Sequence, residues 1–181
     1  TRLDMNFYAG RVEVDGNDVL LDDGTPLEYK PLAVEQNLTA SPYIETAGAR
    51  MKKYEVDRTA YSDGRMPDND IVLYRYADVL LMKAEAKVRN GEDGYAELNA
   101  VRSRVGMPAV TASLDNILNE RLLEHVWEGW RRQDMIRFET YCKSYDIHTP
   151  SELDNKRYAI VFPIPQKARE LNTNLKQNPG Y

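Results

Sequence analysis

Three glutamates stand at four-residue intervals in the stretch ERLLEHVWEGWRRQDMIR, residues 120–137: Glu120, Glu124 and Glu128. On a helix, residues four apart lie on one face, so the three carboxylates would form a row. Two carboxylates about 5 Å apart form the catalytic pair of a retaining glycosidase. Hydrolysis by Glu120 and Glu124 is therefore one function to consider, and a row that holds two helical segments together is the other.

Arginines in the same stretch favour the structural interpretation. An arginine held by a carboxylate stabilises the ionised form of that acid, whereas a catalytic acid has to carry a proton. Carboxylates on one helix also point the same way, whereas the acid and the nucleophile of a glycosidase flank the sugar. We therefore predict a charge network above an apolar seam. Its members are Glu120, Arg121, Glu124, Glu128, Arg131, Asp134 and Arg137.

Patterns for other kinds of site are missing from the sequence. His125 and His148 lie far apart, and neither has a second histidine four residues away, so no metal site is predicted. The single cysteine, Cys142, allows neither an intrachain disulfide nor a cysteine-based metal site. No Walker A, Rossmann glycine or nucleophile-elbow motif is present, so no cofactor is predicted.

Composition narrows the class of protein. The 181 residues include 42% hydrophobic residues and carry a net charge of −5, which is typical of a soluble globular region and disfavours a nucleic-acid partner. The apolar runs are too short to cross a bilayer, and no signal peptide is visible at the start. Tyrosine is abundant, with 12 residues against 3 phenylalanines, and its flat ring with a hydroxyl suits sugars and protein interfaces alike.

The charged stretch belongs to a region with helical periodicity. We predict helices at about 74–91, 94–105 and 114–128, the last capped by Ser113, followed by a continuation over 130–141. The first of them has two apolar strips, so we expect neighbours on both of its sides. One strip contains Ala77, Leu80, Leu81, Ala84 and Val88, and the other contains Val79, Met82 and Ala86. The third has an apolar arc of Ile117, Leu118, Leu122, Val126 and Trp127, and we expect Trp127 and Trp130 in the core.

The flanks have weaker patterns. Residues 1–70 read as irregular, with a β-hairpin over 11–21 that turns at Asp15 and Gly16, and with weaker strand candidates. Residues 142–157 read as irregular, and 159–165 as extended up to Pro165, which precedes a short helix. The predicted fold is mainly α: a helical hairpin packed with further helices, beside an irregular N-terminal region with a small hairpin and long loops. We treat 1–181 as one region, divided into 1–70, 71–141 and 142–181.

Five ordered motifs carry a resemblance to a known family. They are RYADVLLMKAEAKVRNG (75–91), LNAVRSRVGMP (98–108), ERLLEHVWEGWRRQDMIR (120–137), VFPIP (161–165) and QNPGY (177–181). Together they resemble the C-terminal half of the SusD/RagB family of outer-membrane nutrient-binding lipoproteins. The charged residues of 120–137 match a helix motif that recurs in this family whatever the ligand.

The resemblance implies a fold and a function. The hairpin at 74–105 would be one of the tetratricopeptide-like helix pairs of the family. Members are anchored by a lipid to the outer face of the outer membrane and sit over a SusC-type TonB-dependent transporter. They capture glycans, or peptides in the RagB-like branch, without hydrolysing them.

The resemblance also implies that this chain is one part of a longer protein. Complete members begin with a signal peptide and a lipid-bearing cysteine, which we expect on an N-terminal part that precedes residue 1. The ligand platforms of the family are aromatic, so the loop tyrosines Tyr29, Tyr43 and Tyr61 are the candidate ligand-binding residues of this chain. The ligand itself, a particular glycan or a peptide, stays open.

Overall fold

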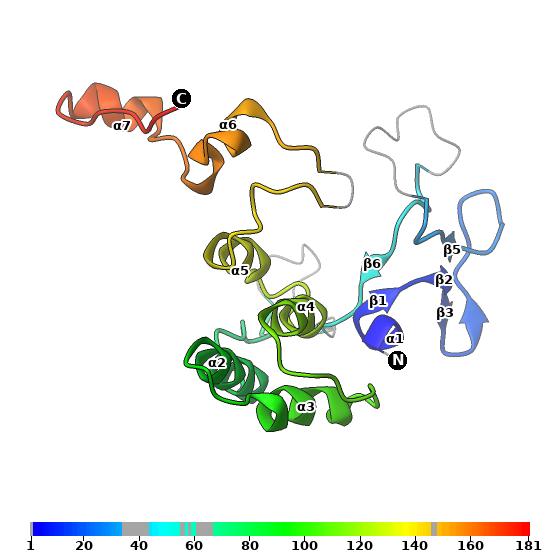
Figure 1. Ribbon diagram of the computed structural model, residues 1–181. Coiled ribbons are helices and arrows are strands. Elements are labelled where there is room, and N and C mark those ends of the chain that lie inside the picture. Colours follow the sequence, from blue (N-terminus) through cyan, green and yellow to red (C-terminus); the bar gives the residue numbers. More distant parts are fainter. Residues whose placement is uncertain (1, 34–43, 55–56, 58, 61–66, 146–147) are drawn as a thin grey trace.

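A helical centre organises the protein. The computed structural model describes residues 2–33, 44–54, 57, 59–60, 67–145 and 148–181. Helices α2 (Tyr76–Arg89) and α3 (Tyr95–Arg104) form a hairpin, and α4 (Leu114–Glu124) packs against both of them (Figure 1). The prediction of a mainly α fold built on a helical hairpin is confirmed.

Local signals fix the ends of these helices. Helix α2 is capped at its carboxyl end by Asn90, which is followed by Gly91 in the left-handed conformation with φ +77°, as the Asn-Gly pair predicted. The Ser113 hydroxyl accepts a hydrogen bond from the amide of Asn116, so the predicted cap of α4 is confirmed. At Gly94, a Cβ atom would lie 2.6 Å from the carbonyl oxygen of Ala84, so only glycine lets the start of α3 approach α2 this closely.

The apolar core lies where these three helices meet. Its fully buried members are Leu81, Ala84, Leu98, Val101 and Ile117, with Ala77 beside them. The prediction that the strip of α2 from Ala77 to Val88 faces the core is therefore confirmed.

The second strip of α2 is not covered. Val79 is 51% exposed and Met82 is 42% exposed, so the expectation of neighbours on both sides of this helix is wrong for the described residues. Leu122 of α4 is also exposed and does not belong to the core. Helical periodicity reports that a strip is apolar, but only packing decides which strip finds a neighbour.

Helix α4 ends four residues earlier than predicted. After Glu124 the chain turns through Trp127, with φ +67°, and Gly129, with φ +79°, before α5 (Arg131–Arg137) begins. Trp127 is 49% exposed and contacts Phe7, so its prediction as a core residue is wrong. Because α4 ends early, Glu128 does not continue the row of glutamates on this helix. Its side chain is instead directed by the turn that follows Glu124.

In its described residues, the N-terminal region combines a short helix with three two-stranded ladders. Helix α1 (Arg2–Asn6) precedes them, and all three are antiparallel. The tightest is the predicted hairpin, which turns at Asp15 with φ +52° and Gly16 with φ +77°. The pairs are β1 (Phe7–Tyr8) with β6 (Arg50–Met51), β2 (Gly10–Arg11) with β5 (Glu28–Tyr29), and β3 (Glu13–Val14) with β4 (Asn17–Asp18).

The C-terminal region holds more helix than predicted. Helix α6 (Glu152–Asn155) lies in the stretch expected to be irregular, and it begins with a capping box between Ser151 and Asp154. The 3₁₀ helix η1 (Tyr158–Ile160) takes the start of the segment expected to be extended. Helix α7 (Gln166–Leu171) follows Pro165 as predicted. Within the described residues, no helix is long and apolar enough to cross a membrane.

Candidate functional site

The row of glutamates predicted on one helix is split between a helix and a turn. Glu120 and Glu124 lie on α4, and their side chains are 0% and 3% exposed. Glu128 lies in the turn after α4, yet its side chain is only 2% exposed. Three carboxylates are thus shielded from water, and each needs a positive partner, since burial of an unpaired charge is costly.

Glu120 is paired from two sides. Arg102 of α3 donates from Nη1 to Glu120 Oε2 at 2.7 Å, and Arg2 of α1 contacts Oε1. Arg102 follows Leu98 by four residues, so it lies on the buried face of α3. The pair therefore joins α3 to α4 inside the molecule, and Arg2 ties the first helix to them.

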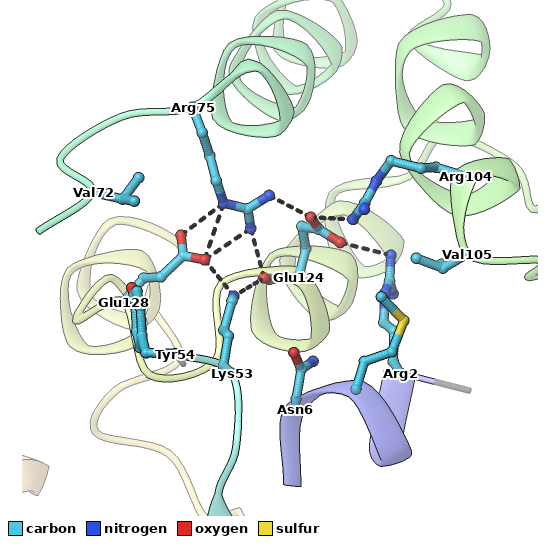
Figure 2. A pocket seen from close by; sticks show the side chains of 11 residues that line it. Arg2, Asn6, Lys53, Tyr54, Val72, Arg75, Arg104, Val105, Glu124 and Glu128 are labelled. Carbon is cyan, nitrogen blue, oxygen red and sulfur yellow. Dashed lines mark hydrogen bonds and ion pairs between the residues drawn. The ribbon is translucent and has the colours of Figure 1, made fainter. Parts of the chain in front are cut away.

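Glu124 and Glu128 share a second set of cations (Figure 2). Arg75 donates from Nη1 to Glu124 Oε1 at 2.5 Å and lies 2.9 Å from Glu128 Oε1 through Nη2. Arg104 Nη2 lies 2.7 Å from Glu124 Oε1, and Lys53 contacts Glu128. Burial by itself would raise the pKa of Glu128, but the contacts with Arg75 and Lys53 outweigh it and lower the pKa.

A second ion-pair cluster links α4, α5 and α2. Arg121 Nε lies 2.8 Å from Asp134 Oδ2, and Arg137 Nη2 lies 2.8 Å from Asp134 Oδ1. Arg137 also contacts Glu85 of α2. Arg131 is different from the other predicted network residues, because it donates to the carbonyl oxygen of Leu118, at 3.4 Å, rather than to a carboxylate.

His125 joins the buried charges at the end of α4. Its Nε2 lies 3.2 Å from Asp78 Oδ1, and its Nδ1 lies 3.0 Å from both Glu128 Oε2 and Arg75 Nη2. Burial lowers the pKa of His125 despite the two carboxylates, with Arg121 and Arg75 acting in the same direction as burial. Nδ1 of a neutral ring can accept from Arg75 or donate to Glu128, depending on which nitrogen carries the proton.

Asp78, His125 and Glu128 also form a group of possible metal ligands, with one ligand atom of each within 4.8 Å of the others. The two carboxylates face different nitrogens of the ring, Asp78 at Nε2 and Glu128 at Nδ1. A single metal ion would bind only one of these nitrogens. Arg75 also stands at Nδ1, where it would repel a cation. The geometry therefore favours an imidazole held in place by its polar neighbours, and no cofactor is assigned to these three residues.

A cavity of about 270 Å³ opens beside the ion pairs of Glu124 and Glu128. Figure 2 shows Arg75 and Lys53 on one side of Glu124, and Arg104 and Arg2 on the other. The walls are completed by Met5, Asn6, Tyr54, Val72 and Val105. The site thus offers charged donors and acceptors together with apolar surface.

Of the three candidate ligand tyrosines, the structure describes Tyr29, which does not line this cavity. Tyr29 lies in β5, and the guanidinium of Arg50 covers its ring at 4.8 Å from the centroid. Tyr43 and Tyr61 lie outside the described residues. Binding of a ligand by these three tyrosines stays a prediction.

The cations that pair with Glu120, Glu124 and Glu128 were missed by sequence reasoning, whereas Arg121 and Arg137, the partners of Asp134, were predicted. Arg2, Lys53, Arg75, Arg102 and Arg104 all come from outside the stretch 120–137 that suggested the network. One signal was available for Arg102, since a basic residue four positions after Leu98 on an apolar face requires an acidic partner. The others come from chain segments whose approach to α4 depends on the tertiary fold.

Comparison with known proteins gives two curated relatives. The starch-binding protein SusD of Bacteroides thetaiotaomicron is 30% identical over 139 residues, which are 73% of this chain and 25% of that protein. The SusD-like protein P38 of Formosa agariphila is 30% identical over 159 residues, which are 78% of this chain and 30% of that protein. The chain therefore spans between a quarter and a third of the length of these relatives.

A solved structure extends the similarity to the fold. Surface glycan-binding protein A from Bacteroides thetaiotaomicron, in complex with laminarihexaose, matches with a TM-score of 0.62 and 29% identity, over 74% of this chain and 31% of that chain. The model of the SusD family matches residues 32–181. That range contains α2 to α7 and all five of the ordered motifs, together with the buried ion pairs that join α2, α3 and α4. The chain belongs to the SusD family.

Proposed function

We propose that this chain is part of a cell-surface protein that binds glycans without cleaving them. The observation that carries the proposal is the similarity to proteins that bind starch and laminarihexaose, at about 30% identity across three quarters of the chain. The proposal includes a lipid anchor on an N-terminal part of the full-length protein, a place on the outer face of the outer membrane, and delivery of the glycan to a SusC-type TonB-dependent transporter.

The surroundings of the glutamates support a binding role over hydrolysis. Glu120 contacts Arg2 and Arg102, and Glu124 contacts Arg75 and Arg104. Guanidinium groups thus occupy both carboxylates, whereas the acid and the nucleophile of a glycosidase have to face the sugar from two sides. Both carboxylates also come from one face of α4, so they do not flank a space between them.

Affinity electrophoresis tests the binding. The chain is run through gels that contain laminarin, soluble starch or another soluble polysaccharide, next to a non-binding reference protein. We expect retardation in at least one of the glycan gels. Migration equal to the reference in every gel, together with no heat of binding to laminarihexaose or maltohexaose, would contradict glycan binding and favour the peptide-binding alternative.

A reducing-end assay tests the absence of catalysis. Incubation of the chain with any polysaccharide that retards it should release no new reducing ends. Release that disappears in Glu124→Gln would show that the hydrolase alternative is correct.

Co-purification tests the partnership with a transporter. Full-length protein that carries an affinity tag should bring a TonB-dependent transporter out of detergent-solubilised outer membranes. Recovery of the tagged protein alone, under conditions that preserve other outer-membrane complexes, would contradict this part of the proposal.

A further inference from the structure

A groove runs along the α2–α3 hairpin on a side that α4 does not cover. Helix α4 packs against both helices of the hairpin, and Leu98 and Arg102 of α3 lie on the face toward it. Ala100 and Arg104 lie on a different face of α3 and line a cavity of about 390 Å³ between α3 and α2. The hairpin thus has one side that receives a helix and a second side that is empty in the described part of the chain.

The floor of this groove is apolar and includes small side chains. Ala77 and Leu80 of α2 form it together with Ala100 and Val101 of α3. The lining residues recur at intervals of three or four on each helix, as in the grooves that receive the ridges of a packed helix. The alanines let the backbone of an added element approach closely.

The apolar surface continues beyond the groove along α2. Tyr76 is 75% exposed at the edge of the groove, and Val79, 51% exposed, and Met82, 42% exposed, follow it at intervals of three. Residues three apart on a helix are neighbours, so these side chains extend the apolar surface of the groove. A continuous exposed surface of this kind marks an interaction site.

Free hydrogen-bonding groups are few in the groove, which disfavours a glycan as its occupant. The three guanidinium nitrogens of Arg75 are all engaged by Glu124 and Glu128. Among the lining residues, Arg104 and the Tyr76 hydroxyl are the polar groups that remain accessible. A sugar carries hydroxyl groups around its ring, and burying them without partners is costly. The groove therefore fits a row of apolar side chains better than a sugar.

The lengths of the relatives indicate where such a row comes from. The chain corresponds to 25% of SusD and 30% of P38, so most of the fold of these relatives lies outside the matched region. Helices α2 and α3 lie inside it. A helix of the same polypeptide is present at a high effective concentration, which a second copy or a separate partner lacks.

We propose that an amphipathic helix from the part of the full-length protein outside residues 1–181 packs in this groove and places large apolar side chains between Ala77 and Ala100. The α2–α3 hairpin is then an inner layer, with α4 on one side and the added helix on the other. The inference goes beyond the proposed function, because it depends on the family of the chain and is independent of the ligand.

Cysteine labelling tests the proposal in the 181-residue chain and in the full-length protein, purified without a transporter. The native cysteines of both are replaced by serine, Cys142→Ser among them. Ala100→Cys then places a thiol on the exposed wall of the groove. We expect a maleimide to label it at least about tenfold more slowly in the full-length protein, because a thiol under a packed helix reacts only when the interface opens.

Ser103→Cys is the matched control. Ser103 is exposed on the same helix, does not line the groove and has nearly the size of cysteine, so we expect equal labelling rates in the two proteins. An unchanged rate at Ala100→Cys in the full-length protein, or equal slowing at both positions, would overturn the inference.

The same measurement separates the other possible occupants. Slow labelling of Ala100→Cys already in the 181-residue chain, with a rate that rises on dilution, would assign the groove to a second copy. Slow labelling that begins only after a TonB-dependent transporter is added would assign it to the transporter. Either result would overturn the inference.

A large side chain tests the same contact through stability. Ala100→Trp occupies the space that the added helix needs, so we expect it to lower the melting temperature of the full-length protein more than that of the 181-residue chain. Equal shifts in the two proteins would contradict the packed helix. Absence of glycan binding in affinity electrophoresis would remove the proposed function and leave these results unchanged, so the two proposals fail separately.

Discussion

The buried carboxylates are the residues on which the centre of the molecule depends. Glu120 has no exposed surface, and its charge is balanced by Arg2 and Arg102. Taking such a charge out of water costs several kcal/mol, and the paired geometry offsets this cost. Loss of one partner leaves the other charges buried and unpaired, which is worse than replacing the whole group by apolar residues.

Removal of the Glu120 charge should therefore destabilise the fold strongly. We expect Glu120→Gln to lower the free energy of unfolding by about 3–5 kcal/mol, measured by urea denaturation. The matched control is Glu152→Gln, since Glu152 is 80% exposed and pairs with Lys156 at i+4, an arrangement that contributes less than about 1 kcal/mol. A loss as small as that of the control would show that the Glu120 pairs do not stabilise the protein.

His125 should make stability depend on pH. The groups that face it are Asp78, Glu128, Arg75 and Arg121, and burial is the largest of the effects that leave its pKa below the ordinary value of 6.5. The unfolded chain then takes up a proton more readily than the folded chain, so stability is complete above about pH 6.5 and decreases as the pH falls below it.

Urea denaturation between pH 5 and 8 measures this dependence. We expect the free energy of unfolding to decrease from pH 7 to pH 5 in the wild type and to change less in His125→Gln. His148→Gln, which replaces the other histidine of the sequence, should retain the wild-type slope. An unchanged slope in His125→Gln would assign the pH dependence to other groups.

At the scale of elements, the close approach of α2 and α3 creates the framework for the ion pairs. Gly94 lies directly before α3 and against the backbone of Ala84, with space for a hydrogen atom only. This contact sets the position of α3, whose Arg102 and Arg104 reach Glu120 and Glu124 of α4. Gly94 thus helps to set the positions of the Arg102 and Arg104 side chains relative to α4.

An added methyl group at this contact should separate the two helices. We expect Gly94→Ala to lower the free energy of unfolding by about 1–3 kcal/mol through overpacking against Ala84. Gly91→Ala is a control for the loss of a glycine, since no atom lies within 4 Å of the added Cβ and only the left-handed φ of +77° is unfavourable. Crystal structures or amide exchange would show whether α3 moves in Gly94→Ala alone.

At the scale of the whole molecule, the C-terminal region forms a separate packing unit beside the helical centre (Figure 1). Hydrogen bonds within this region hold its segments together. Gln177 exchanges two hydrogen bonds with the backbone of Ile164, and the Tyr181 hydroxyl donates to the carbonyl of Val161. Arg132 of α5 connects this unit to the centre through the carbonyl of Ile160 at 3.0 Å and the ring of Phe162 at 4.2 Å.

Loss of this connection should loosen the C-terminal unit without unfolding the centre. We expect Arg132→Ala to be cleaved by chymotrypsin after Tyr158 roughly tenfold faster than the wild type, because a cation–π contact and charged hydrogen bonds together contribute at least about 1.4 kcal/mol. Gln133→Ala, an exposed change on the same helix, is the control. Equal cleavage of the two variants would show that other contacts hold the unit.

The sequence by itself determined several local features of the structure and the acidic side chains of the site. The Asp15-Gly16 turn, the end of α2 at Asn90 and the Ser113 cap each act through atoms a few residues apart, so they are visible in the sequence. The acids of 120–137 were visible for the same reason, as a periodic row. Five ordered motifs were sufficient to indicate the family.

Only the tertiary structure decided which cations meet these acids. Arg2, Lys53 and Arg75 precede Glu124 by 49 residues or more, and their arrival depends on the path of α1, β6 and the segment before α2. The early end of α4 had the same origin, because a left-handed Trp127 is unfavourable locally and is compensated by the burial of Glu128 among partners from distant segments. Long-range packing, which sequence periodicity does not encode, therefore placed these cations beside the buried acids.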